Sequence, residues 1–296
     1  LIGPDSIGML VPPVGLNASL AHMDAMPGQI ALISQSGAIA ATLVDWAAER
    51  GLGFSHVVSL GEMADVDLGD YLDLIAGDIA TRAVLVYMES IPAPRKFLSA
   101  ARALSRLKPV IAVKAGRSQA GARAAATHTG TLSGADEVVE AALLRAGVLR
   151  VGGMSELFGA AETVARYRPM QRARLGIVTN AGGAGVQAVD RLMQIGGTLA
   201  DLSPETRAAL AGLLPADWRP GHPVDIDGDA APERYAEVVA CVAADPGVDV
   251  VLVMNCPSAR ASSRAAAAAV AGLTERGMVA RKPVLGCWLG GPSARR

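Results

Sequence analysis

The sequence predicts an α/β protein with two tandem flavodoxin-like domains, each built on a doubly wound parallel sheet. Short apolar segments alternate along the chain with amphipathic segments of helical spacing, which is the order of parallel strands joined by crossover helices. This order runs through the first half and starts again in the second. Of the 296 residues, 51% are hydrophobic and 3% aromatic, so we expect aliphatic cores around buried strands.

The first half contains four predicted strands and five predicted helices. Residues 37–50 have apolar side chains at helical spacing, among them Ile39, Leu43 and Trp46, and Gly51 follows them as a stop signal. The predicted strands are Gln29–Ser34, Val57–Leu60, Ala83–Met88 and Val110–Val113, and the predicted helices are Gly37–Arg50, Leu68–Ala76, Arg95–Leu107, Ala135–Ala146 and Ser155–Arg168.

The pattern restarts after the charged stretch Arg166–Arg174. Residues 175–183 repeat the character of residues 30–37, and an amphipathic helix is expected after each. Val250–Met254 corresponds to Val84–Met88, and residues 282–285 correspond to residues 108–111. We therefore expect one domain over residues 25–170 and a second over residues 171–296.

Composition and charge exclude several classes of partner. The formal net charge is −1, and the only basic run is Arg295-Arg296, so no nucleic-acid partner is expected. The three cysteines lack metal-type spacing and are expected to be buried and reduced. No apolar run reaches bilayer-spanning length and no segment resembles a signal peptide, so we expect a cytoplasmic protein with neither a membrane partner nor a metal site.

Turns rich in Gly and Ser follow the first predicted strand of each half. Ser34, Ser36 and Gly37 precede the first helix, and Gly182 and Gly183 precede its counterpart. Free backbone N–H groups and the helix dipole make such a helix start suitable for a phosphate. The same residue types also serve as ordinary helix caps, and for each turn alone this alternative stays open.

One histidine and one carboxylate have the chemistry for phosphoryl transfer. His128 lies in a predicted loop of small and hydroxylated residues that follows the buried strand Pro109–Lys114, and imidazole nitrogen is a competent nucleophile near neutral pH. Glu89 ends an apolar strand, where an unpaired carboxylate is costly. A carboxylate beside His128 would fix its tautomer and stabilise a phosphorylated cation. The alternatives are an ordinary loop histidine and a solvated strand end.

A weak dinucleotide-binding pattern also occurs in the second half. Residues 183–188 match G-x-G-x-x-A after a strand, and Asp201 follows near the end of the next apolar segment. The spacing to Asp201 is short, and no neighbouring residue suggests hydride transfer. A nicotinamide-dependent oxidoreductase therefore remains as an alternative from this pattern alone.

Six motifs run in one order along nearly the whole chain: Leu32–Gly37, Ser59–Gly61 with Asp65–Asp67, Lys114–Ser118, Thr127–Gly130, Asn180–Gly183 and His222–Asp225. The series resembles the NDP-forming acyl-CoA synthetases, which are the ADP-forming acetyl-CoA synthetases and their relatives, the succinyl-CoA synthetases. The resemblance depends on the whole series, because any single motif would be unspecific.

The resemblance implies a ligase core that interconverts acyl-CoA, phosphate and ADP with a carboxylic acid, CoA and ATP through an acyl phosphate and a phosphohistidine. By resemblance, His128 would carry the phosphoryl group and Glu89 would orient it. The turns at Ser36 and Gly182 would then face a shared cleft and hold the phosphate between two helix N-termini. CoA or acyl-CoA and phosphate are the expected ligands. ADP or ATP with Mg²⁺ would bind a domain that this chain lacks.

Parts of the family pattern are missing from this chain. We expect residues 1–24 to be the tail of a missing CoA-binding domain, and the second domain to be truncated at its carboxyl end. The expected partners are that CoA-binding domain and an ATP-grasp domain or subunit, in an oligomer. A further alternative is the ligand-binding or regulatory region of a protein lysine acetyltransferase with a fused GCN5-type domain.

Overall fold

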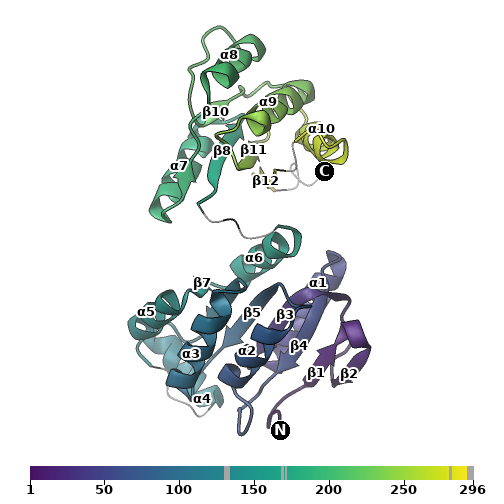
Figure 1. The fold of residues 1–296 in the computed structure, drawn as a ribbon, viewed down its shortest axis with the longest axis vertical. Coiled ribbons are helices and arrows are strands. Elements are labelled where there is room, and N and C mark those ends of the chain that lie inside the picture. The colour runs from purple at the N-terminus through teal and green to yellow at the C-terminus, as the bar shows by residue number, and fades with distance from the viewer. Residues whose placement is uncertain (130–133, 168–169, 171, 280–281, 292–296) are drawn as a thin grey trace. The chain divides into compact units, whose positions relative to one another are not determined.

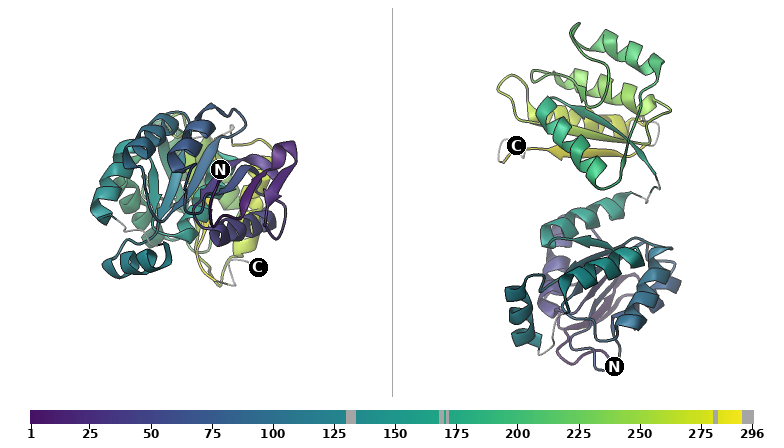
Figure 2. Two further views of the ribbon diagram at one scale, coloured as in Figure 1. Left: turned by 90° about the horizontal axis from the view of Figure 1, so that it is seen from below. Right: turned by 90° about the vertical axis from the view of Figure 1, so that its left-hand side faces the viewer.

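The computed structural model describes residues 1–129, 134–167, 170, 172–279 and 282–291, and the chain forms two compact units, Leu1–Pro169 and Met170–Arg296 (Figure 1). Both units contain parallel strands flanked by helices, as the views in Figures 1 and 2 show. The predicted class, an α/β fold with flavodoxin-like parallel sheets, is confirmed.

The first unit contains a seven-stranded sheet in the order β2-β1-β4-β3-β5-β6-β7. The strands from β3 onward pair in parallel, whereas β1 is antiparallel to both β2 and β4. The strands are β1 Gly8–Val11, β2 Leu16–Ser19, β3 Pro27–Ser34, β4 Phe54–Ser59, β5 Ala83–Met88, β6 Val110–Lys114 and β7 Leu149–Val151. The helices are η1 Pro12–Val14, α1 Gly37–Glu49, α2 Leu68–Gly77, α3 Pro94–Ser105, α4 Gln119–Thr129, α5 Asp136–Ala146 and α6 Met154–Arg166.

Each face of the first sheet has its own core. Residues of α2, α3 and α5 pack with Ile33 and Val86 on one face. Residues of α1 and α6 pack with Leu32 and Leu85 on the other. Because neighbouring strand residues point to opposite faces, a continuous apolar run such as Ile30–Ile33 is buried on both sides, and the sheet presents only its ends to ligands.

Residues 1–24 pack on the first unit. β1 and β2 form a hairpin that extends its sheet, and the N–H groups of Glu62 and Ala64 donate to the carbonyl oxygens of Pro4 and Gly3. From the sequence, this segment was expected only as the tail of another domain, and neither strand was predicted. Strands of only four residues are too short to show a periodic signal.

The second unit contains a five-stranded sheet in the order β10-β8-β11-β12, with β9 paired to β8, and all its pairs are parallel. The strands are β8 Arg174–Thr179, β9 Thr198–Leu199, β10 Val224–Asp225, β11 Val250–Asn255 and β12 Val284–Trp288. The helices are α7 Gly182–Gln194, α8 Pro204–Leu213, α9 Pro232–Ala244 and α10 Ser263–Glu275. Its core contains α9 residues such as Tyr235 and Val239 packed against Val178 and Val253.

Two local predictions are wrong. The segment around His128 is not a loop: the backbone from Gln119 to Thr129 is helical, because this segment is rich in alanine, the strongest helix former. Ser118 precedes it and its hydroxyl oxygen accepts from the N–H of Gly121 at 3.0 Å. The cysteines are not fully buried, since Cys241, Cys256 and Cys287 are all partly exposed and free.

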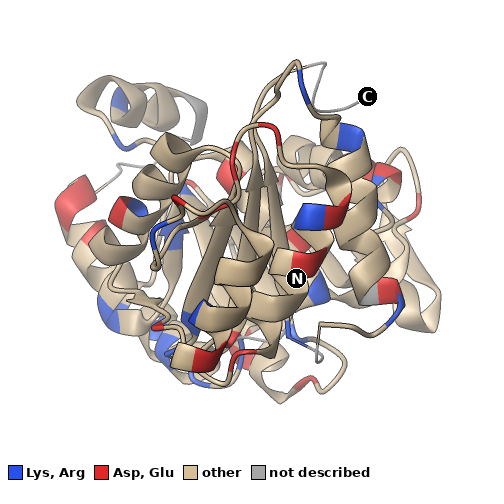
Figure 3. Ribbon diagram, turned by 90° about the horizontal axis from the view of Figure 1, so that it is seen from above, with Lys and Arg blue, Asp and Glu red and all other residues tan. Residues whose placement is uncertain are grey.

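Lys, Arg, Asp and Glu are interspersed on the helices seen in Figure 3. Among the described residues, no helix combines the length and apolarity needed to cross a membrane.

Candidate functional site

The turn that opens α1 is closed by two serines. Ser34, the last residue of β3, donates through its hydroxyl to the carbonyl oxygen of Ser36 at 2.7 Å and accepts from the Ser36 N–H at 3.2 Å. The Ser36 hydroxyl oxygen in turn accepts from the N–H of Ile39 at 3.3 Å and caps the helix. The predicted capping role is therefore present, and phosphate binding by the remaining free N–H groups of this first turn, which Gly37 heads, stays a prediction.

The same turn recurs at the start of α7. Thr179 ends β8, and its hydroxyl donates to the Ala181 carbonyl oxygen at 3.2 Å and accepts from the Ala181 N–H at 3.0 Å. Ala181 occupies the cap position without a side-chain hydrogen bond. Unlike the start of α1, the helix start that contains Gly182 therefore has no side-chain cap.

A side-chain amide in each turn holds the residue that follows the neighbouring strand. The side-chain oxygen of Gln35 accepts from the N–H groups of Glu89 and Ser90, at the end of β5. Asn180 accepts from the Cys256 N–H at 2.8 Å and donates to the Cys256 carbonyl oxygen at 2.9 Å, at the end of β11. In both units, a side-chain amide of the turn therefore binds the backbone at the carboxyl end of the neighbouring strand.

Two of the predicted glycines are required by close neighbours. A Cβ at Gly37 would lie 2.5 Å from a methyl carbon of Ile7, and a Cβ at Gly182 would lie 2.7 Å from a carboxylate oxygen of Asp225. Gly183 has open space around it. The Asp225 carboxylate therefore already lies against the positive end of α7, where it opposes the binding of a second anion.

Glu89 is 9% exposed and lies directly after β5. Burial raises the pKa of Tyr87 to about 12, and the charge of Glu89 and a hydrogen bond to it add to the shift. A nearly buried carboxylate of this kind favours a partner that is cationic or donates a hydrogen bond.

Lys114 lies at the same carboxyl edge of the first sheet. From the sequence it was predicted only as a member of the motif Lys114–Ser118. It is 4% exposed, pairs with Met88 in the sheet, and donates through Nζ to the Ala115 carbonyl oxygen at 2.6 Å. Burial lowers the pKa of its ammonium group, an effect that the carboxylates of Asp136 and Glu89 oppose. The sequence feature that could have indicated this residue is a lysine at the end of an otherwise apolar strand.

His128 belongs by its backbone to the last turn of α4, and its side chain lies outside the described residues. The pairing of His128 with Glu89 therefore stays a prediction. The described structure does bring Ser34, Ser36, Gly37 and Glu89 to one sheet edge, because β3 and β5 are adjacent parallel strands.

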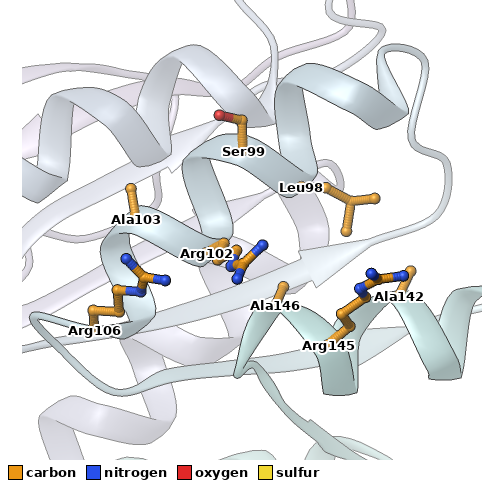
Figure 4. A pocket seen from close by; sticks show the side chains of 8 residues that line it. All are labelled: Leu98, Ser99, Arg102, Ala103, Arg106, Ala142, Arg145 and Ala146. Carbon is orange, nitrogen blue, oxygen red and sulfur yellow. The ribbon is translucent and has the colours of Figure 1, made fainter.

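Two hollows lie between α3 and α5 in the first unit. The larger, about 610 Å³, contains three arginines, whose side chains lie along the space between the helices in Figure 4. The smaller, about 230 Å³, is mainly apolar and reaches Ser90 and Lys114, next to Glu89. Among the described side chains, none that the sequence predicted as a site lines either hollow. The larger is lined by Leu98, Ser99, Arg102, Ala103, Arg106, Ala142, Arg145 and Ala146.

Comparison with known proteins identifies both units. Residues 27–164 match the succinyl-CoA ligase like flavodoxin domain, and residues 175–283 match the ligase-CoA domain. The chain is 39% identical over 293 residues to acetate–CoA ligase [ADP-forming] I of Archaeoglobus fulgidus, covering 99% of this chain and 41% of that protein. It is 38% identical to the alpha subunit of acetate–CoA ligase [ADP-forming] I of Pyrococcus furiosus, covering 88% of this chain and 56% of the subunit.

A solved structure agrees with these matches. Acetyl-coenzyme A synthetase 1 of Candidatus Korarchaeum cryptofilum, in complex with phosphate and ADP, superimposes with a TM-score of 0.89 at 32% identity, covering 99% of this chain and 64% of that one. The chain thus spans about half the length of these relatives. Their names give no support to the acetyltransferase alternative. With both units matched in sequence and in structure, the chain belongs to the NDP-forming acyl-CoA synthetase family, of which it contains the two central flavodoxin-like domains.

Proposed function

We propose that this chain is the phosphoryl-carrying core of an ADP-forming acyl-CoA synthetase, with His128 as the residue that becomes phosphorylated. The observation that carries the proposal is the repeated turn: the same hydroxyl-closed, glycine-headed turn opens α1 and α7 at the carboxyl ends of two parallel sheets. Ligands of doubly wound sheets bind at this end, and helix N-termini favour phosphate.

The proposed reaction proceeds in three balanced steps. Phosphate oxygen attacks the thioester carbonyl of acyl-CoA, which releases the CoA thiol and forms an acyl phosphate. An imidazole nitrogen of His128 then attacks phosphorus, which breaks the bond to the acyl oxygen and releases the carboxylate. Phosphohistidine finally transfers its phosphoryl group to ADP, and ATP leaves. The reverse sequence makes acyl-CoA from a carboxylic acid, CoA and ATP.

Residues of this chain would act on the phosphate and on the histidine. In the first unit, the helix start at Ser36 and Gly37 binds the phosphate. In the second unit, the helix start at Gly182 and Gly183 is the proposed phosphate-binding end, where the Asp225 carboxylate weakens the attraction. Glu89 accepts a hydrogen bond from the nitrogen of His128 that does not attack, which leaves the other nitrogen free and stabilises positive charge on the ring. The CoA-binding and ATP-grasp domains, with the Mg²⁺-nucleotide, come from the rest of the protein or from a partner subunit.

The test uses the full-length protein with γ-labelled ATP and Mg²⁺. Wild type should take up label that is lost in acid and kept in base, as expected for a phosphoramidate. His128→Asn should abolish this label, and Glu89→Gln should slow its uptake without removing it. His22→Asn is the matched control, because His22 is a mainly exposed histidine of the same unit. Acid-labile labelling of His128→Asn at the wild-type rate would refute the assignment.

A further inference from the structure

The larger hollow of the first unit, between α3 and α5, is bordered by small side chains. Ser99 and Ala103 line it from α3, and Ala142 and Ala146 line it from α5. Large side chains at these positions would fill the space between two helices packed at the usual separation of about 8–10 Å. The hollow that the small residues leave open measures about 610 Å³. Sites for small molecules typically measure roughly 300–1,000 Å³, so it is large enough for a ligand.

Three arginines line the same hollow. Arg102 and Arg106 lie at the C-terminal end of α3, and Arg145 lies in the last turn of α5. Their side chains extend along the space between the two helices (Figure 4). The negative end of a helix dipole favours a positive charge at each of these positions. It does not explain why guanidinium groups from two helices border one hollow whose described lining contains no carboxylate.

The positive charge of these arginines is not offset by neighbouring carboxylates. None of the three forms an ion pair or a side-chain hydrogen bond within the described part of the chain. The sequence of α3, Pro94–Ser105, contains no Asp or Glu. Two of the three carboxylates of α5, those of Asp136 and Glu140, pair with Arg150 instead. Because like charges repel one another at short range, an anion bound in the hollow would relieve this repulsion.

The side chains of the hollow suit a phosphorylated organic ligand. A guanidinium group presents its N–H donors in a planar fork that matches two oxygens of a phosphate. Linked phosphate groups carry several negative charges over a short distance, so one such ligand can contact arginines of both helices. Leu98 and the alanines of the lining offer an apolar surface to the organic part of the same ligand.

We propose that this hollow is a binding site for a small organic ligand with linked phosphate groups, which bind Arg102, Arg106 and Arg145. An acidic segment of another protein fits less well, because a stable protein interface involves roughly 20–30 residues on each side, whereas eight residues line the hollow. The proposal is independent of the proposed function, since it uses none of the residues assigned to phosphoryl transfer. α3 begins shortly after Glu89, and the arginines lie at its opposite end.

Titration calorimetry of the 296-residue chain tests the site with two probes. ADP joins a diphosphate to an organic body, and inorganic pyrophosphate supplies the diphosphate alone. We expect saturable binding of ADP with a Kd below about 1 mM, and weaker binding of pyrophosphate because it lacks the part that contacts the apolar surface.

Substitutions in the lining locate the binding. Arg102→Gln and Arg145→Gln should each weaken ADP binding by about fivefold or more, and added salt should weaken it as well. Arg95→Gln is the matched control, because Arg95 is an exposed residue of α3 outside the lining, and it should leave the Kd unchanged. Equal denaturation midpoints for the three variants show that any loss of binding is not a loss of folding.

A second pair of variants separates a built site from a positively charged surface. Ala103→Phe fills the hollow while leaving the three arginines in place, so it should weaken ADP binding at least as much as the arginine changes. Ala141→Phe is its control, at an exposed position of α5 outside the lining. Absence of saturable ADP binding, or binding that neither Arg102→Gln nor Ala103→Phe reduces, would overturn the proposal. Pyrophosphate binding more tightly than ADP would also overturn it. So would tighter binding of a hexaglutamate peptide that the same variants abolish, which would identify an acidic protein segment as the occupant.

Discussion

Gln35 holds Glu89 in place at the carboxyl edge of the first sheet, because its side-chain oxygen accepts a hydrogen bond from the Glu89 N–H. The same oxygen accepts from the Ser90 N–H at 2.9 Å, and the Gln35 amide nitrogen donates to the Ser90 hydroxyl at 3.0 Å. A residue of the turn that opens α1 thus sets the position of the proposed orienting carboxylate.

Replacing Gln35 should therefore cost stability and activity together. Gln35→Ala leaves two buried N–H groups without an acceptor, and we expect a loss of about 2 kcal/mol or more in the free energy of unfolding. Histidine labelling should slow as well, because Glu89 is no longer held. Gln29→Ala is the control: the side chain of exposed Gln29 accepts from partly exposed Arg82 at 2.9 Å, and its loss should change stability by less than about 0.5 kcal/mol. Equal denaturation midpoints for the two variants would contradict this account.

Adjacent glycines at the start of α7 should respond in opposite ways. Gly182→Ala places a Cβ 2.7 Å from the Asp225 carboxylate and should destabilise the second unit by about 1–3 kcal/mol. Gly183→Ala meets no neighbour and should leave stability unchanged or raise it by up to about 1 kcal/mol. Chemical denaturation measures both. Asp225→Ala should reduce the cost of Gly182→Ala in a double-mutant cycle, and additive effects would show that the contact is not the cause.

Two serine caps allow stability to be separated from function. Ser36 caps α1 and Ser203 caps α8, and each accepts from a backbone N–H of its own helix. Either change to alanine should cost about 1 kcal/mol. Only Ser36→Ala should also slow phosphohistidine formation, because only α1 begins at the proposed phosphate site. Equal labelling rates in the two variants would remove Ser36 from the site.

The second unit should lose stability in mildly acidic solution. Burial lowers the pKa of His222 from its ordinary value of 6.5, and a hydrogen bond between Nδ1 and the Ile177 backbone opposes part of this shift. Below pH 6.5 the unfolded chain therefore binds more protons than the folded one. The free energy of unfolding consequently decreases as the pH is lowered from 6.5, until the pH lies below the folded-state pKa of His222. His222→Asn should flatten this part of the profile. A wild-type profile without a slope between pH 6.5 and the onset of carboxylate titration would refute the assignment.

The α/β class, the order of strands and helices, and the family can all be predicted from the sequence alone. Runs such as Ile30–Ile33 and Val84–Met88 are apolar at consecutive positions because both sheet faces are buried, and that local pattern is legible without a structure. The glycine and serine turns were equally legible, since a helix start has unpaired N–H groups wherever it occurs. A loop was predicted around His128 because hydroxylated residues flank it, whereas the alanines that precede it favour the helix that forms.

Which side chains come into contact, by contrast, depends on the three-dimensional packing of the chain. Gln35 and Glu89 are 54 residues apart in the sequence and become partners because parallel pairing of β3 with β5 places their strand ends side by side. The burial of Lys114 and the closeness of the Asp225 carboxylate to the Gly182 backbone likewise depend on strand order. Hydrogen bonds and desolvation act over a few ångströms, so their partners are set by chain packing and not by spacing along the chain.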